Sequence, residues 1–219
     1  MTIDNADNKA QKRRKVRAIL ASGLVLGVGA AVTLAAWNDS VWGKAEFGTG
    51  ANSWNVQGNF TGASDGWNEF VTANAAGSFN FGVNASALVP GDTVYAKVGL
   101  RVVSESLGAN ITMPAAQNAT NEALAGVLDL KVASIAGSST ACDAAAVNGT
   151  TRTSGKVGSA AITAPIAIPA KNEHWLCFAV TLPAGTTPGQ LGTANEGKYS
   201  TSVNWEFKAA STEPANPTP

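Results

Sequence analysis

Histidine and charged residues are scarce in this sequence of 219 residues. There is one histidine, His174, and charged side chains make up 14% of the chain. Zinc hydrolysis needs a cluster of ligands such as His-Glu-x-x-His together with a general base, so one histidine excludes the usual zinc site. A serine nucleophile would have to use this same single histidine, His174, as its base. We therefore predict no catalytic residues, no metal site and no cofactor, and we expect that the protein is not an enzyme.

Positive charge is concentrated near the N-terminus. Six of the 15 basic residues lie between residues 9 and 17, and the mostly apolar residues 18–36 follow directly. This order is typical of an export signal, and we predict a signal peptide at residues 1–35. Small residues two positions apart, Thr33 and Ala35, favour cleavage between Ala35 and Ala36. An uncleaved anchor is the alternative, because nineteen mostly apolar residues just span a bilayer core of about 30 Å.

Charge elsewhere in the chain is low and slightly negative. Without residues 1–35, nine basic and 13 acidic residues remain, a net charge of −4. This balance gives no electrostatic case for binding nucleic acid, and we expect membrane contact only through an uncleaved signal. The remaining length suits one domain, which we place at residues 51–210. An N-terminal segment at residues 36–50 precedes it, and the proline-rich residues 211–219 are predicted to be a disordered tail.

Alternating apolar residues indicate strands, and no long amphipathic helix is visible after residue 36. In the clearest strand, residues 93–103, five apolar side chains share one face, while Lys97 and Arg101 lie on the other, which we expect to be wet. A second strand is expected at residues 198–208, with Tyr199, Val203, Trp205 and Phe207 among its inward side chains. Further strands are expected at residues 176–182, 128–132 and 79–81, and weaker ones at 41–47, 52–56, 69–72, 110–113 and 160–164.

These short segments, separated by polar turns, favour an all-β fold. A helical turn near residues 121–125 is the only helix expected after residue 36. We predict a jelly-roll-like β-sandwich of about eight to ten strands.

The only two cysteines, Cys142 and Cys177, both lie in the part predicted to be exported. Two cysteines in an exported chain usually pair, so we predict a disulfide between them, with free thiols as the alternative. In the chain-entropy model, a bridge closing a loop of about 35 residues stabilises the fold by about 3–4 kcal/mol.

Four stretches together resemble the TasA/camelysin group. They are residues 36–39 (Ala-Trp-Asn-Asp) after a Thr-x-Ala cleavage context, residues 44–50, the Leu-Val-Pro-Gly-Asp turn at residues 88–92, and the strand at 199–207 ending in Lys-Ala-Ala. That group contains surface and matrix proteins of Gram-positive bacteria, exported by an alternate, SipW-type signal peptide. The glycine-rich and tryptophan-rich sequence also resembles an actinobacterial branch of such exported proteins. Residues 104–170 depart from the pattern.

The resemblance implies a jelly-roll domain that forms fibres, in which an N-terminal segment of one subunit completes the sheet of the next. The partners would then be further copies of this chain, together with the alternate-type signal peptidase during export. Residues 37–50 would supply the donor strand, with Trp37, Val41, Trp42 and Phe47 as its assembly residues. The alternative is that residues 41–47 form the first strand of their own domain.

Two functions follow from these patterns. The first is an exported structural protein of a cell-surface fibre or biofilm matrix. The second is a monomeric secreted module that binds a glycan or a protein through exposed tryptophans, for which Trp54, Trp67 and Trp175 are the candidates. Packing of these rings against a sheet or a loop is the alternative interpretation.

Overall fold

The computed structural model describes residues 12–17, 54–194 and 198–212. The chain divides into two compact units, Met1–Gly48 and Thr49–Pro219. The described residues of the first unit, 12–17, are helical. Among the described residues, no helix is long and apolar enough to cross a bilayer. The predicted cleavage site at Ala35 and Ala36 and the predicted assembly residues lie outside the described ranges; the latter are Trp37, Val41, Trp42 and Phe47.

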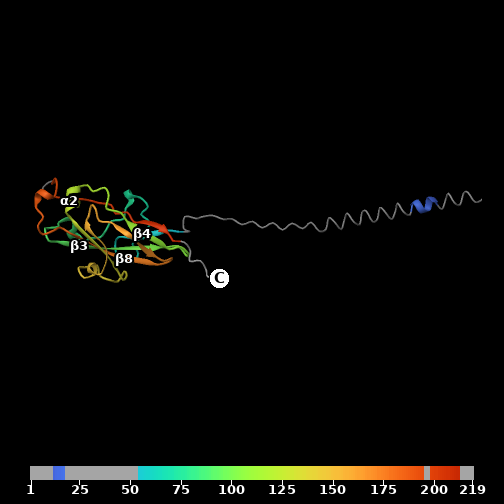
Figure 1. The fold of residues 1–219 in the computed structure, drawn as a ribbon, viewed down its shortest axis with the longest axis horizontal. Coiled ribbons are helices and arrows are strands. Elements are labelled where there is room, and N and C mark those ends of the chain that lie inside the picture. Colours follow the sequence, from blue (N-terminus) through green and yellow to red (C-terminus); the bar gives the residue numbers. More distant parts are fainter. Residues whose placement is uncertain (1–11, 18–53, 195–197, 213–219) are drawn as a thin grey trace, which may run out of the picture. The chain divides into compact units, whose positions relative to one another are not determined.

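Nine strands within the described residues of the second unit form two antiparallel sheets (Figure 1). The order in the six-stranded sheet is β2 (Trp67–Asn68), β1 (Val56–Asn59), β3 (Thr93–Val102), β8 (Glu173–Thr181), β5 (Asp129–Ile135) and β6 (Thr150–Lys156). The order in the three-stranded sheet is β7 (Ile162–Ile168), β4 (Ala109–Met113) and β9 (Lys208–Ser211). The all-β prediction is confirmed, while the jelly-roll connection stays a prediction.

Short helices lie in the connections between these strands. They are η1 (Ala73–Ala75), η2 (Val83–Ser86), α2 (Glu122–Val127), η3 (Ala146–Asn148) and η4 (Pro188–Gln190). The Asn121 side chain caps α2 by accepting a hydrogen bond from the Leu124 N–H at 3.0 Å. Asparagine is among the best residues at this position, because its side-chain oxygen satisfies a backbone donor of the first turn. The predicted helical turn is confirmed.

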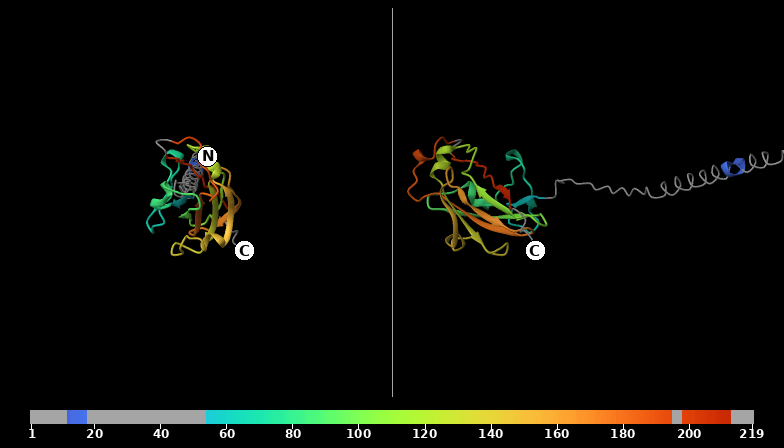
Figure 2. Two further views of the ribbon diagram at one scale, coloured as in Figure 1. Left: turned by 90° about the vertical axis from the view of Figure 1, so that its left-hand side faces the viewer. Right: turned by 45° about the vertical axis from the view of Figure 1, so that its right-hand side comes forward.

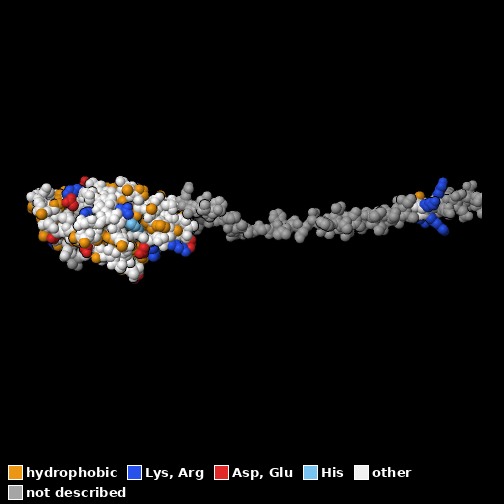
Figure 3. Space-filling model, turned by 60° about the horizontal axis from the view of Figure 1, so that its bottom comes forward, with side chains coloured by type: hydrophobic (Ala, Val, Ile, Leu, Met, Phe, Trp, Pro, Cys, Tyr) orange, Lys and Arg blue, Asp and Glu red, His pale blue; other side chains and the backbone are white. Residues whose placement is uncertain are grey.

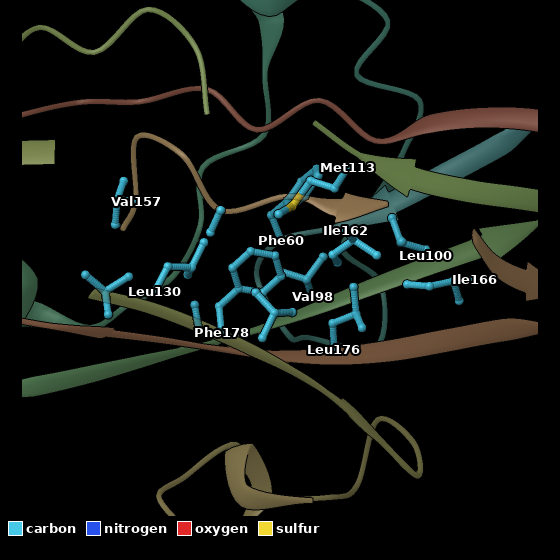
Figure 4. Close-up of a cluster of buried hydrophobic side chains, with 14 of the residues drawn as sticks. Phe60, Val98, Leu100, Met113, Leu130, Val157, Ile162, Ile166, Leu176 and Phe178 are labelled. Atoms are coloured by element: carbon cyan, nitrogen blue, oxygen red, sulfur yellow. The ribbon is translucent and has the colours of Figure 1, made fainter. Parts of the chain in front are cut away.

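The core lies between the two sheets. Every second residue of β3, from Val94 to Val102, is buried as the alternation predicts. Figure 4 shows Val98, Leu100, Leu176 and Phe178 of the large sheet close to side chains of the small sheet, including Met113, Ile162 and Ile166. Fully burying one such side chain stabilises the fold by roughly 1.5–3 kcal/mol, so this shared core holds the two sheets together.

The other face of the large sheet is not simply wet, as the sequence suggested. A second cluster of buried residues lies there, formed by Ala133, Val147, Cys177 and Ala179. The disulfide between Cys142 and Cys177 joins the connection after β5 to the middle of β8, with 5.2 Å between the two Cα atoms. The predicted pairing is confirmed, and the bridge holds the 136–149 connection against this face.

The strand expected at residues 198–208 is wrong in extent, since regular pairing begins only at Lys208. The inward side chains are as expected, because Tyr199, Val203, Trp205 and Phe207 pack partly buried against the core. The sequence of the neighbouring strand, β4, explains why pairing stops at Lys208. Pro114 directly follows β4 and has no N–H to donate, so the ladder between β4 and β9 stops there. It resumes only as a bridge between Gln117 and Asn204.

Two other expected strands are irregular segments. Phe70 has a φ of 45°, which is incompatible with an extended strand at residues 69–72. Phe79 and Phe81 are partly buried against the core, but the chain around them has no strand pairing. These residues supply ring packing without a ladder.

The structure also contains features that the pattern missed. β6 was not predicted, because its sequence Thr-Thr-Arg-Thr-Ser-Gly-Lys has no apolar alternation. Ser211, assigned to the tail, ends β9, and Thr212 donates its N–H to the Gly108 carbonyl at 3.0 Å. The domain therefore extends to residue 212.

Candidate assembly site

The two sheets differ in width, and the described residues provide no strand to close one side of the sandwich. There the core of the six-stranded sheet is covered by irregular segments, which include residues 69–81 and 199–207. Between these segments lies a hollow of about 460 Å³. Its lining comes from β1 and β3, from the loop at residues 69–77, from Phe79, and from residues 203–207. We call this hollow and the adjoining edge of β9 the open side.

Aromatic rings make up much of the inner wall of the open side. The centroid of Phe60 lies 5.3 Å from that of Phe70 and 4.9 Å from that of Phe79, and Phe79 lies 4.9 Å from Trp205. Such contacts stabilise by about 0.5–1.5 kcal/mol each beyond the burial of area. The wall is thus an apolar surface held in place by packing, and Val71 on its rim is 80% exposed.

One polar group in this wall is unsatisfied. The indole N–H of Trp205 is buried and has no hydrogen-bond partner among the described residues. A buried donor without a partner costs about 1–3 kcal/mol. An entering group with a carbonyl oxygen could accept this hydrogen bond and recover part of that cost.

Strand edges are sites of unwanted pairing, and proteins usually block them with bulges, prolines, charges or short length. In the large sheet, the β2 edge has only two residues, and β6 is interrupted by a bulge where its pairing shifts opposite Val132 and Ala133. In the small sheet, Pro165 interrupts the β7 edge. The β9 edge has neither a bulge nor a proline, and its one charge, Lys208, lies 3.6 Å from Glu206. Of the four edges formed by the described strands, β9 is the least protected.

The chain before β9 continues this edge along the hollow. The backbone of Asn204 exchanges two hydrogen bonds of 2.9 Å with that of Gln117, on the side where β9 pairs with β4. The opposite backbone edge of residues 203–211 therefore faces away from β4. Figure 2 shows this red segment running along the length of the domain.

The chain from the N-terminal side enters the domain close to the end of β9. The indole N–H of Trp54 donates to the Gly108 carbonyl at 3.0 Å. The Gly108 N–H in turn donates to the Thr212 hydroxyl at 3.0 Å. Trp54, the first described residue of the domain, therefore lies at the end where β9 finishes.

The three tryptophans considered for glycan binding are packed into the domain instead. Trp175 is 2% exposed and donates its indole N–H to Glu173 at 2.8 Å. Trp67 contacts it edge-on at 5.4 Å between centroids and is covered by the Arg101 guanidinium at 4.6 Å. Trp54 is half-buried and hydrogen-bonded to Gly108. The packing interpretation is correct for these rings.

His174 belongs to a hydrogen-bonded chain across three strands. Its Nε2 lies 2.8 Å from the Ser134 hydroxyl, which accepts a hydrogen bond from Arg152 Nε at 2.6 Å. Burial, and secondarily the positive charge of Arg152, lower the pKa of His174. The lowered pKa favours the neutral ring, and the tautomer decides whether Nε2 or the Ser134 hydroxyl is the donor. Within the described ranges, no three His, Cys, Asp or Glu side chains are grouped so that they could hold a metal.

The exterior offers no comparable charged feature on the face shown in Figure 3, where a few basic and acidic side chains are scattered among neutral and hydrophobic ones. Comparison with known proteins finds no matching family model and no matching curated protein. Membership of the TasA/camelysin group stays a prediction. The functional proposal below is therefore based on the open side.

Proposed function

We propose that the protein is an exported structural protein that forms or joins a surface fibre or extracellular matrix. Its subunits would join by strand addition, in which an extended segment of one copy occupies the open side of the next. The observation that carries the proposal is the conjunction of an aromatic hollow with the least protected strand edge. Export is supported by the signal-like N-terminus and by the disulfide, which is typical of oxidising compartments.

The open side suits an extended peptide for two reasons. The free edge of β9 offers backbone donors and acceptors, which give affinity in strand addition. The hollow beside it accepts apolar side chains, which give specificity because alternate residues of a strand point to one face. The aromatic wall and the exposed Val71 make an apolar occupant favourable.

The proposed occupant is the segment of residues 37–47 from another copy. It lies between the predicted cleavage site and the compact unit that begins at Thr49. Its apolar residues include Trp37, Val41, Trp42 and Phe47, and a segment of this length can cover the nine residues 203–211. Cleavage before Ala36 would release its N-terminal end from the membrane, so processing would control both export and assembly.

The test compares a chain that begins at Ala36 with one that begins at Asn52. The Ala36 chain should form filaments in negative-stain electron microscopy and sediment as large species, because it carries the donor segment. The Asn52 chain keeps every described residue of the compact unit and should sediment as a monomer. A matched control is the Ala36 chain with Val41→Ser and Phe47→Ser, which keeps the length but removes apolar anchors and should assemble poorly.

Two results would contradict the proposal. If both chains assemble equally, the N-terminal segment is not the donor. If the Ala36 chain stays a sharp monomer, the segment completes its own domain, and the monomeric binding module is the better function.

A further inference from the structure

We propose that the donor segment enters the open side parallel to the C-terminal segment, with residues 41–47 of one copy opposite residues 203–209 of the next. This register rests on the proposed function and adds an orientation and specific side-chain pairs to it. Residues 41–47 read Val-Trp-Gly-Lys-Ala-Glu-Phe, and residues 203–209 read Val-Asn-Trp-Glu-Phe-Lys-Ala.

The acceptor segment has two distinct faces. All of residues 203–207 line the hollow, but only Val203, Trp205 and Phe207 among them pack against the core, and Ala209 continues this row in β9. Glu206 and Lys208 alternate with them and are exposed. A strand added alongside must match both rows, because a shift of one residue turns every side chain to the wrong face.

Large and small side chains alternate across the proposed inward row. Gly43 would lie beside Trp205 and Ala45 beside Phe207, so the smallest donor residues meet the largest acceptor rings. At the end of the row, Phe47 would lie beside the small Ala209. Interlocking of this kind fills space without overlap, which close packing requires.

The outward row pairs opposite charges. Lys44 would lie beside Glu206, and Glu46 beside Lys208. Within one copy, Glu206 and Lys208 already lie 3.6 Å apart, with side chains 55% and 60% exposed. An exposed pair of this kind contributes little, so both groups are available to pair with a donor. Cross-strand pairs of opposite charge stabilise a sheet, and like charges destabilise it.

The second charge pair decides the orientation. An antiparallel donor that keeps Lys44 beside Glu206 places Trp42, rather than Glu46, beside Lys208. Only the parallel register satisfies both charged residues of the acceptor row. The Lys44 and Glu206 pair is therefore common to both orientations, while the Glu46 and Lys208 pair is specific to one.

Charge-reversal variants of the Ala36 chain test the register. Lys208→Glu should raise the critical concentration for assembly by about tenfold, because it places a glutamate beside Glu46. Adding Glu46→Lys to it should restore the critical concentration to within about twofold of the parent chain. Lys44→Glu and Glu206→Lys should behave in the same way, each harmful alone and compensated together. The control is Lys198→Glu, an exposed lysine outside the paired stretch with the same change of charge, which should leave assembly unchanged.

Thermal unfolding of the Asn52 chain carrying Lys208→Glu or Glu206→Lys shows whether an acceptor substitution damages the fold itself. If Lys44→Glu and Glu206→Lys compensate each other while Glu46→Lys fails to compensate Lys208→Glu, the parallel register is wrong and strand addition stands. If none of the four single variants changes assembly, the register is also wrong. Failure of the proposed function is distinguishable, because the Ala36 chain would then not assemble better than the Asn52 chain.

Discussion

Replacing Phe178 by alanine is expected to lower the free energy of unfolding by about 3–5 kcal/mol, the usual cost of deleting a buried aromatic ring. Phe178 is completely buried in β8. Its ring centroid lies 5.2 Å from that of Phe79, 5.6 Å from Trp205 and 6.3 Å from Phe207. It therefore connects the large sheet to the irregular segments that wall the hollow. Urea unfolding of the Asn52 chain, followed by circular dichroism, measures the loss.

The matched control for this substitution is Phe178→Leu. It keeps most of the buried volume and should cost clearly less than the alanine variant, because the cavity left behind is smaller. A loss below about 1 kcal/mol for Phe178→Ala would contradict the packing described for this side of the core. The domain's total stability is expected within about 5–15 kcal/mol, so the alanine variant removes a large share of it.

Removing the disulfide with the double substitution Cys142→Ala and Cys177→Ala is expected to lower the free energy of unfolding by about 3–4 kcal/mol. The bridge closes a sequence separation of 35 residues, so its loss increases the entropy of the unfolded chain. Denaturant titration of the oxidised parent and the variant measures the difference.

Ser139→Ala provides a control in the same connection, since Ser139 is exposed and lies outside the bridge. It should change the stability by less than about 0.5 kcal/mol. Equal stability of the parent and the double-alanine variant would contradict the role assigned to the bridge. Because Cys177 is also fully buried in the middle of β8, a loss somewhat above the entropic value is consistent with the structure.

Much of the fold could be predicted from periodicity, because a sheet with one buried face gives an alternating sequence. β3 is the clearest case, with five alternate residues buried from Val94 to Val102. The same logic fails for β6, which pairs through its backbone and contains three threonines and one serine but no apolar side chain. Its run of β-branched threonines was the one available signal.

Alternation alone also overpredicted strands. Residues 198–207 show the alternation of inward and outward side chains typical of a strand. A strand also needs a neighbouring strand to accept and donate its backbone hydrogen bonds. On one side of residues 198–207, the neighbouring segment after β4 contains Pro114, which cannot donate a hydrogen bond. On the other side, the described residues provide no strand. Residues 203–207 of this unpaired segment form part of the wall of the open side.

The candidate site could be predicted only in part. The donor segment was proposed from the signal junction and its apolar residues, all contiguous in sequence. The acceptor could not be found in this way, because its wall combines Phe60, Phe70, Phe79 and Trp205, which are far apart in the chain. Alternation does not reveal how much of the outer face is covered, since Trp175 points away from the core and is still buried beneath Trp67 and Arg101.

The measurement that tests strand addition most directly is calorimetric titration of a peptide of residues 37–50 into the chain beginning at Asn52. Strand addition predicts saturable binding with one peptide per domain, accompanied by a change in tryptophan fluorescence as the ring of Trp205 is covered. A peptide of the same composition in scrambled order should not bind, because it loses the alternation that fits the hollow. No binding of the natural peptide, or equal binding of the scrambled one, would contradict the account.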